Sequence, residues 1–121
     1  MSVYLAGLAA AWLHFVFFLV ESVFWRKTAW KVFRIPAEQS ELPSLRLFAF
    51  NMGFYNLFLS MGMLAGLVLQ WQGCPGGRSL VTFVGLSMVG AGLVLLVSRK
   101  RLLGPLIQAG PAAYCLWSLW H

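Results

Sequence analysis

The sequence predicts an all-α, polytopic membrane protein built as a bundle of four transmembrane helices. Hydrophobic residues make up 60% of the chain and charged residues only 10%, and the mean hydropathy is +0.79. A water-soluble chain of 121 residues could not hide so much apolar surface, because short chains bury a limited share of their surface on folding. The lipid bilayer is therefore the expected partner of the chain.

Four apolar stretches have the length that a bilayer crossing requires, which is about twenty helical residues for about 30 Å of hydrocarbon. The first stretch is too long for the apolar part of a signal peptide and has no basic residues before it, so we expect it to be retained. The expected spans cover residues 3–25, 45–71, 79–98 and 102–120, within a single domain of residues 1–121.

The connector at residues 26–44 is the only long polar one. Pro36 and Pro43 disfavour a continuous helix through it. Its first half mixes basic and aromatic residues, so we expect this part to lie among the lipid headgroups, held by Trp30 and Phe33. The other two connectors are a Pro-Gly-Gly turn at residues 72–78 and a very short turn at 99–101.

The basic residues indicate the orientation of these spans. Connectors one and three share a side and carry eight cations, whereas the opposite side carries only Arg78. The eight are Arg26, Lys27, Lys31, Arg34, Arg46, Arg99, Lys100 and Arg101. Cationic loops remain in the cytoplasm, which predicts both termini outside (N-out/C-out) in a multi-pass protein of the inner (plasma) membrane. The net charge of +6 thus reflects topology, and we expect no nucleic acid partner.

Polar residues inside the spans are candidates for function, because such groups are unfavourable in hydrocarbon. A rise of about 1.5 Å per residue sorts them into two layers in the cytoplasmic half. The shallower layer holds Glu21, Asn51 and Gln108, and the deeper layer holds His14, Tyr55, Asn56 and Ser87. Spacings of seven between His14 and Glu21, and of four between Asn51 and Tyr55, place each pair on one helix face. These faces predict a buried polar pocket lined from spans one, two and four.

Two interpretations of this polar set stay open. In the first, His14, Glu21 and Tyr55 act as acid, base and orienting group, while Asn51, Asn56, Gln108 and Ser87 bind a ligand. In the second, the same groups only form hydrogen bonds between helices, each worth roughly 0.6 kcal/mol, and Glu21 either snorkels to the membrane surface or pairs with Arg26 there.

Metal and cofactor sites are not expected. The two histidines, His14 and His121, and the two cysteines, Cys74 and Cys115, are too scattered for a closed ligand set. The cysteines also lack the C-x-x-C spacing of thiol oxidoreductases. No phosphate-binding loop, nucleophile elbow or dinucleotide fingerprint is present in the sequence.

Several stretches resemble one protein family. They are residues 14–21 (HFVFFLVE), Trp25, residues 31–33 (KVF), residues 51–59 (NMGFYNLFL) and residues 108–112 (QAGPA). They are similar to the small bacterial membrane proteins of domain-of-unknown-function family 1304, and Asn-x-Gly-x-Tyr-Asn is the most specific part. Met52 stands where that family usually has glutamine. The resemblance implies a four-span membrane protein, draws attention to the same polar residues, and implies no activity.

Three functions remain as hypotheses. The first is binding of a small amphipathic or lipid-like molecule, with acid–base transformation of that molecule left open. The second is a very small proton-coupled exporter of hydrophobic compounds, although Glu21 lies near the end of the first span rather than at its centre. The third is a structural or partner-binding membrane subunit that docks through residues 30–34. Gly62-x-x-x-Gly66 is a helix-packing motif, and a homo-oligomer stays an alternative.

Overall fold

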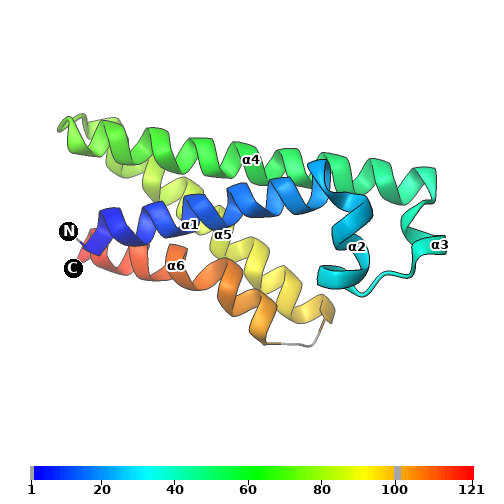
Figure 1. Ribbon diagram of the computed structural model, residues 1–121. Helices are drawn as coiled ribbons and strands as arrows, with labels where there is room; N and C mark the ends of the chain where they lie inside the picture. Colours follow the sequence, from blue (N-terminus) through cyan, green and yellow to red (C-terminus); the bar gives the residue numbers. More distant parts are fainter. Residues whose placement is uncertain (1, 100–101) are drawn as a thin grey trace. The chain divides into compact units, whose positions relative to one another are not determined.

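A computed structural model describes residues 2–99 and 102–121, and all regular structure in these parts is helical (Figure 1). The all-α prediction is therefore confirmed. The helices are α1 (Ser2–Phe18), the π-helix η1 (Leu19–Val23), α2 (Trp25–Phe33), α3 (Ala37–Ser40), α4 (Pro43–Trp71), α5 (Pro75–Arg99) and α6 (Leu103–Trp120). Two cations of the charge count, Lys100 and Arg101, lie outside the described residues.

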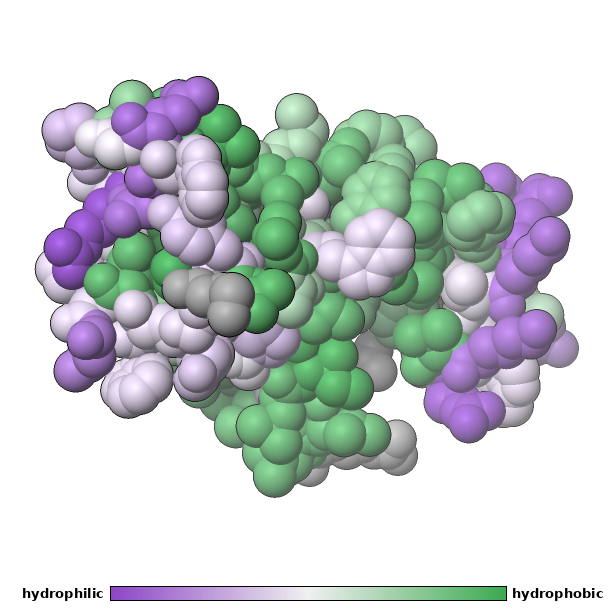
Figure 2. All heavy atoms as spheres, turned by 60° about the vertical axis from the view of Figure 1, so that its left-hand side comes forward, coloured by the Kyte–Doolittle hydropathy of each residue, from purple (hydrophilic) through white to green (hydrophobic). Residues whose placement is uncertain are grey.

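Three helical segments in the described part of the chain are long and apolar enough to cross a membrane. They are Ser2–Val23, which joins α1 and η1, Pro43–Trp71 and Pro75–Ser98. The expectation of four such segments is not met, because α6, although its 18 residues are long enough, contains Pro105, Gln108 and Pro111, which lower its hydropathy. Figure 2 shows broad apolar areas beside separate hydrophilic clusters on the face that it draws, as is typical of helices that contact lipid.

The chain forms two compact units, one of Met1–Leu13 with Leu59–His121 and one of His14–Phe58. We call them the terminal unit and the connector unit. The boundaries between the units fall inside α1, after Leu13, and inside α4, after Phe58, so each of these helices is divided between the two units.

Small residues allow the helices of the terminal unit to approach closely. A Cβ atom on Gly66 would lie 2.8 Å from Cγ2 of Val81, and one on Gly62 would lie 3.1 Å from Cγ2 of Val84. Both glycines of the Gly-x-x-x-Gly motif therefore face α5 of the same chain. Helices α5 and α6 lie side by side (Figure 1). The buried apolar core consists of Ala6, Ala10, Ala11, Met63, Leu67, Val81, Val84, Met88, Ala112 and Cys115.

Both chain ends meet at one end of the terminal unit (Figure 1). The Cys115 thiol on α6 lies 3.4 Å from the carbonyl oxygen of Val3 on α1. The rings of Tyr4 and Trp71 meet edge to face at 5.5 Å, which brings the end of α4 to the same place. Helix α6 thus returns along α5 to the level at which α1 begins.

In the connector unit, short helices join α1 to α4. Arg34 adopts a left-handed conformation (φ 59°) after α2, Pro36 precedes α3, and Pro43 is the first residue of α4. The two prolines interrupt the helix as predicted. Phe33 is half-buried, and its ring lies 5.7 Å from that of the buried Trp25. Trp30 is exposed.

Candidate functional site

The first membrane-length segment ends in a π-helix. The amide of Phe24 donates to the carbonyl of Leu19 at 2.8 Å, and the chain then turns into α2. The Thr28 hydroxyl donates to the carbonyl of Val20 at 2.6 Å, which satisfies a backbone group at the turn. A π turn holds more residues than an α turn, so the seven-residue spacing between His14 and Glu21 does not follow a regular α-helix.

The π-helix presents Glu21 to α4. The Asn56 side-chain amide donates to Oε2 of Glu21 at 2.8 Å. Asn56 is only 7% exposed, and Glu21 is half-buried. The expected pairing of Glu21 with Arg26 is not found, because Arg26 pairs with Glu41 instead. The sequence singled out Glu21 and Asn56 but placed them in different layers.

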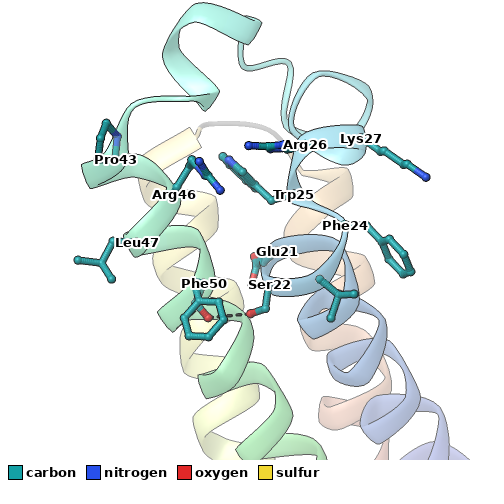
Figure 3. Close-up of a pocket in the computed structure, with 11 residues that line it drawn as sticks. Glu21, Ser22, Phe24, Trp25, Arg26, Lys27, Pro43, Arg46, Leu47 and Phe50 are labelled. Atoms are coloured by element: carbon teal, nitrogen blue, oxygen red, sulfur yellow. Dashed lines mark hydrogen bonds between the residues drawn. The ribbon is translucent and has the colours of Figure 1, made fainter.

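A close helix contact lies beside this pair. The Ser22 hydroxyl donates to the carbonyl oxygen of Phe50 at 2.7 Å (Figure 3). A Cβ atom on Gly53 would lie 2.9 Å from Cβ of Ser22 and 3.0 Å from its backbone nitrogen. Sequence reasoning did not name Ser22 or Gly53 as site residues, although the glycine of Asn-x-Gly-x-Tyr-Asn was the available signal.

An open cleft of about 620 Å³ lies between η1 with the start of α2 on one side and the start of α4 on the other (Figure 3). Its lining combines one carboxylate, three cations and several apolar side chains. These residues are Glu21, Ser22, Val23, Phe24, Trp25, Arg26, Lys27, Pro43, Arg46, Leu47 and Phe50.

Glu41 forms ion pairs with one arginine on each side of the cleft. Its Oε1 lies 3.6 Å from Nε of Arg26, and its Oε2 lies 3.7 Å from Nη1 of Arg46. Trp25 fixes the segment before Glu41, because its indole nitrogen donates to the carbonyl of Ser40 at 2.9 Å. The two arginines thus come from different helices and share one carboxylate.

The other candidate residues lie elsewhere. In the connector unit, His14 is fully buried and its ring contacts Phe17, Tyr55 is 64% exposed, and the Asn51 amide donates to its own helix at the carbonyl of Leu47. In the terminal unit, the Ser87 hydroxyl donates to the carbonyl of Phe83, and Gln108 is half-buried. None of these five is among the described residues that line the cleft.

The long apolar helices define a helical, membrane-associated protein. Comparison with protein families then gives a particular assignment. The model of the family described as "Protein of unknown function (DUF1304)" matches residues 8–120. The chain belongs to this family, as its motifs indicated. Searches of curated proteins and of solved structures gave no match.

Proposed function

We propose that this protein is a multi-pass inner-membrane protein that binds a small amphipathic, lipid-like molecule in the cleft between η1 and the start of α4. One observation carries the proposal. The Glu21 carboxylate, at the end of a membrane-length apolar segment, is held by Asn56 and lines an open cleft.

A carboxylate in such a segment needs several hydrogen-bond donors, because a charged group is strongly disfavoured away from water. Asn56 supplies one donor, to Oε2, and an ionised carboxylate accepts about four hydrogen bonds. A ligand hydroxyl or amine in the cleft would supply another. The apolar part of the ligand would lie against Leu47 and Phe50, which are exposed and line the same cleft.

The proposed topology has four spans, with both termini outside and α2 and α3 in the cytoplasm. The charge distribution supports this orientation. The return of α6 to the level of Val3 supports α6 as the fourth span, since 18 helical residues extend about 27 Å. The outer face of α6 also exposes large apolar side chains, including Leu103, Leu106 and Trp117, which suit lipid better than water.

Binding is favoured over acid–base catalysis and over proton-coupled export. Catalysis by His14, Glu21 and Tyr55 would need all three groups at one substrate, and only Glu21 lines the cleft. Export would make binding or transport depend on a proton gradient, which the experiment below measures.

The experiment is to purify the full chain in mild detergent and to identify and quantify co-purifying amphipathic molecules by mass spectrometry. We expect Glu21→Gln to retain about a tenth of the parent's bound molecule, because it loses a charge-assisted hydrogen bond to the ligand. Glutamine can still accept from Asn56, so the fold is preserved. Glu38→Gln, which changes an exposed carboxylate on α3, is the matched control and should retain the parent's content.

Three results would overturn the proposal. A parent protein that carries no amphipathic molecule would indicate a structural or partner-binding subunit. Equal content in the parent and in Glu21→Gln would remove the cleft as the binding site. Movement of the molecule across reconstituted vesicles that requires a proton gradient would indicate an exporter instead.

A further inference from the structure

We propose that the ligand's head group is a phosphodiester anion bound by Arg26 and Arg46, and that Glu41 occupies these two guanidinium groups when the head group is absent. This inference rests on the proposed function and names the chemistry of its ligand. Glu41 would therefore act as an internal competitor for the site.

The geometry begins with two arginines on opposite sides of one cleft. Arg26 lies in the first turn of α2 and Arg46 in the first turn of α4, and both line the cleft. Each approaches Glu41 through a single nitrogen, at 3.6 Å and 3.7 Å. A guanidinium carries five N–H donors in a fork that can bind two phosphate oxygens at once. The single contacts with Glu41 do not use this bidentate mode, which is stronger and which a phosphate ligand could use.

The charges of the lining favour an anion at the arginine end. Lys27 adds a third cation to Arg26 and Arg46, whereas Glu21 is the one carboxylate among the lining residues. Glu41 is exposed, as are both arginines, and ion pairs in such surroundings contribute only about 0.2–1 kcal/mol each. A phosphate that binds bidentately would displace this carboxylate readily.

Two anchors in one cleft identify the occupant. The arginines suit a phosphate, and the Glu21 carboxylate, already held by Asn56, suits a hydroxyl donor on the same head group. A hydroxylated phospholipid such as phosphatidylglycerol carries both groups, together with acyl chains for the exposed Leu47 and Phe50. In the proposed topology the cleft faces the cytoplasmic leaflet, where basic clusters bind anionic lipids.

The test uses the full chain in dodecyl maltoside, titrated with dioctanoyl phosphatidylglycerol or with dioctanoylglycerol, which lacks the phosphate. Lipid binding is measured by native mass spectrometry. We expect phosphatidylglycerol to bind about tenfold tighter than dioctanoylglycerol, which has the same acyl chains and a hydroxyl but no phosphate, because only phosphatidylglycerol makes the bidentate charged contact. Inorganic phosphate at millimolar concentration should not displace it, since phosphate has no apolar part.

The Glu41 variant gives the decisive measurement. Glu41→Gln should tighten phosphatidylglycerol binding by about two- to tenfold, because two exposed ion pairs no longer compete. Its affinity for dioctanoylglycerol should not change, because that lipid has no phosphate to compete with Glu41. Arg46→Gln should weaken phosphatidylglycerol binding and remove the gain when combined with Glu41→Gln. Glu38→Gln, which changes a carboxylate of the same segment, is the control and should match the parent.

The outcomes separate this inference from the proposed function. If neither lipid binds and no amphipathic molecule co-purifies, the proposed function fails. If both lipids bind equally, or if Glu41→Gln and Glu38→Gln behave alike, only the phosphate site with its internal competitor is overturned. If inorganic phosphate displaces the lipid, the arginines bind a free anion, and the lipid assignment is wrong.

Discussion

The Asn56 amide donates two hydrogen bonds, one to the Glu21 carboxylate at 2.8 Å and one to the Met52 carbonyl of its own helix at 3.1 Å. The bond to Met52 fixes the orientation of the amide, so little side-chain entropy is lost when Asn56 donates to Glu21. A side chain that is positioned in this way stabilises a buried charge more effectively than a mobile one. The pair therefore serves the fold as well as the proposed site.

Removing the amide should reveal this stabilisation. Asn56→Leu should lower the free energy of unfolding by about 1–3 kcal/mol, because a half-buried carboxylate loses its donor. Glu21→Leu in that background should recover part of the loss, which a double-mutant cycle in detergent measures. The control is Asn51→Leu, because among the described residues the Asn51 amide donates to Leu47 of its own helix; its effect should stay within about 0.5 kcal/mol. Equal losses at positions 51 and 56 would contradict a specific role for the pair.

At the residue scale, the sequence predicted which polar side chains lie in the spans but not which of them meet. Glu21 and Asn56 were both named because polar groups in apolar stretches are conspicuous. Their pairing depends on the π turn at Leu19–Val23 and on how closely α4 approaches it. Both are set by packing between helices, which residue spacing along one helix does not record.

At the scale of elements, the contact between η1 and α4 depends on the absence of a side chain at Gly53. The Ser22 hydroxyl occupies the space where a Cβ atom would lie and donates to the Phe50 carbonyl. The backbone nitrogen of Ser22 is also close to that space, so a side-chain rotation alone cannot make room. The two elements that form the cleft walls are held together at this point.

Gly53→Ala should therefore separate these elements. We expect a loss of about 1–3 kcal/mol in the free energy of unfolding, the usual range for overpacking a tight contact, together with weaker ligand binding. Ser22→Gly in the same chain should restore part of both, because it removes the atoms that clash. Gly90→Ala is the matched control, since nothing lies within 4 Å of its added Cβ atom. It should be neutral or slightly stabilising through its higher helix propensity. Similar losses at Gly53 and Gly90 would exclude the tight contact as the cause.

Each apolar stretch named from the sequence contains a long helix, but the first is divided between α1, which ends at Phe18, and η1, and α5 begins at Pro75, before the expected residue 79. Helix α2 was not predicted, because it has only nine residues and several of them are basic. It is stabilised by the packing of Trp25 and Ala29 against Ala49. The π-helix was missed for a related reason, since its sequence is continuous with the apolar run of α1. Short elements depend on their tertiary contacts, whereas long apolar helices are evident from composition.

At the scale of the whole chain, two independent observations bear on topology. Basic residues gather in connectors one and three, and the first turn of α1 meets the last turns of α4 and α6 in the terminal unit. Arg78, at the start of α5, lies 4.0 Å from the ring of Trp120 and donates to the carbonyl of Leu119 at 3.0 Å. The turn between α4 and α5 and both chain ends are thus at one level, as the four-span topology proposed above requires.

The native cysteines make this topology directly measurable. Cys74 lies half-buried in the turn before α5, and Cys115 is buried, so a membrane-impermeant maleimide should label intact cells or right-side-out vesicles through Cys74 alone. Cys74→Ser should abolish the labelling, and Ala37→Cys in that background should be labelled only in inside-out vesicles. A reporter fused after Trp120 should be active on the same side as Cys74, because α6 crosses back in the proposed topology. If that reporter lies opposite Cys74, α6 does not cross the membrane and the chain has three spans. If Cys74 is labelled only from the cytoplasmic side, the orientation inferred from the cations is reversed, and the cleft opens to the outer leaflet.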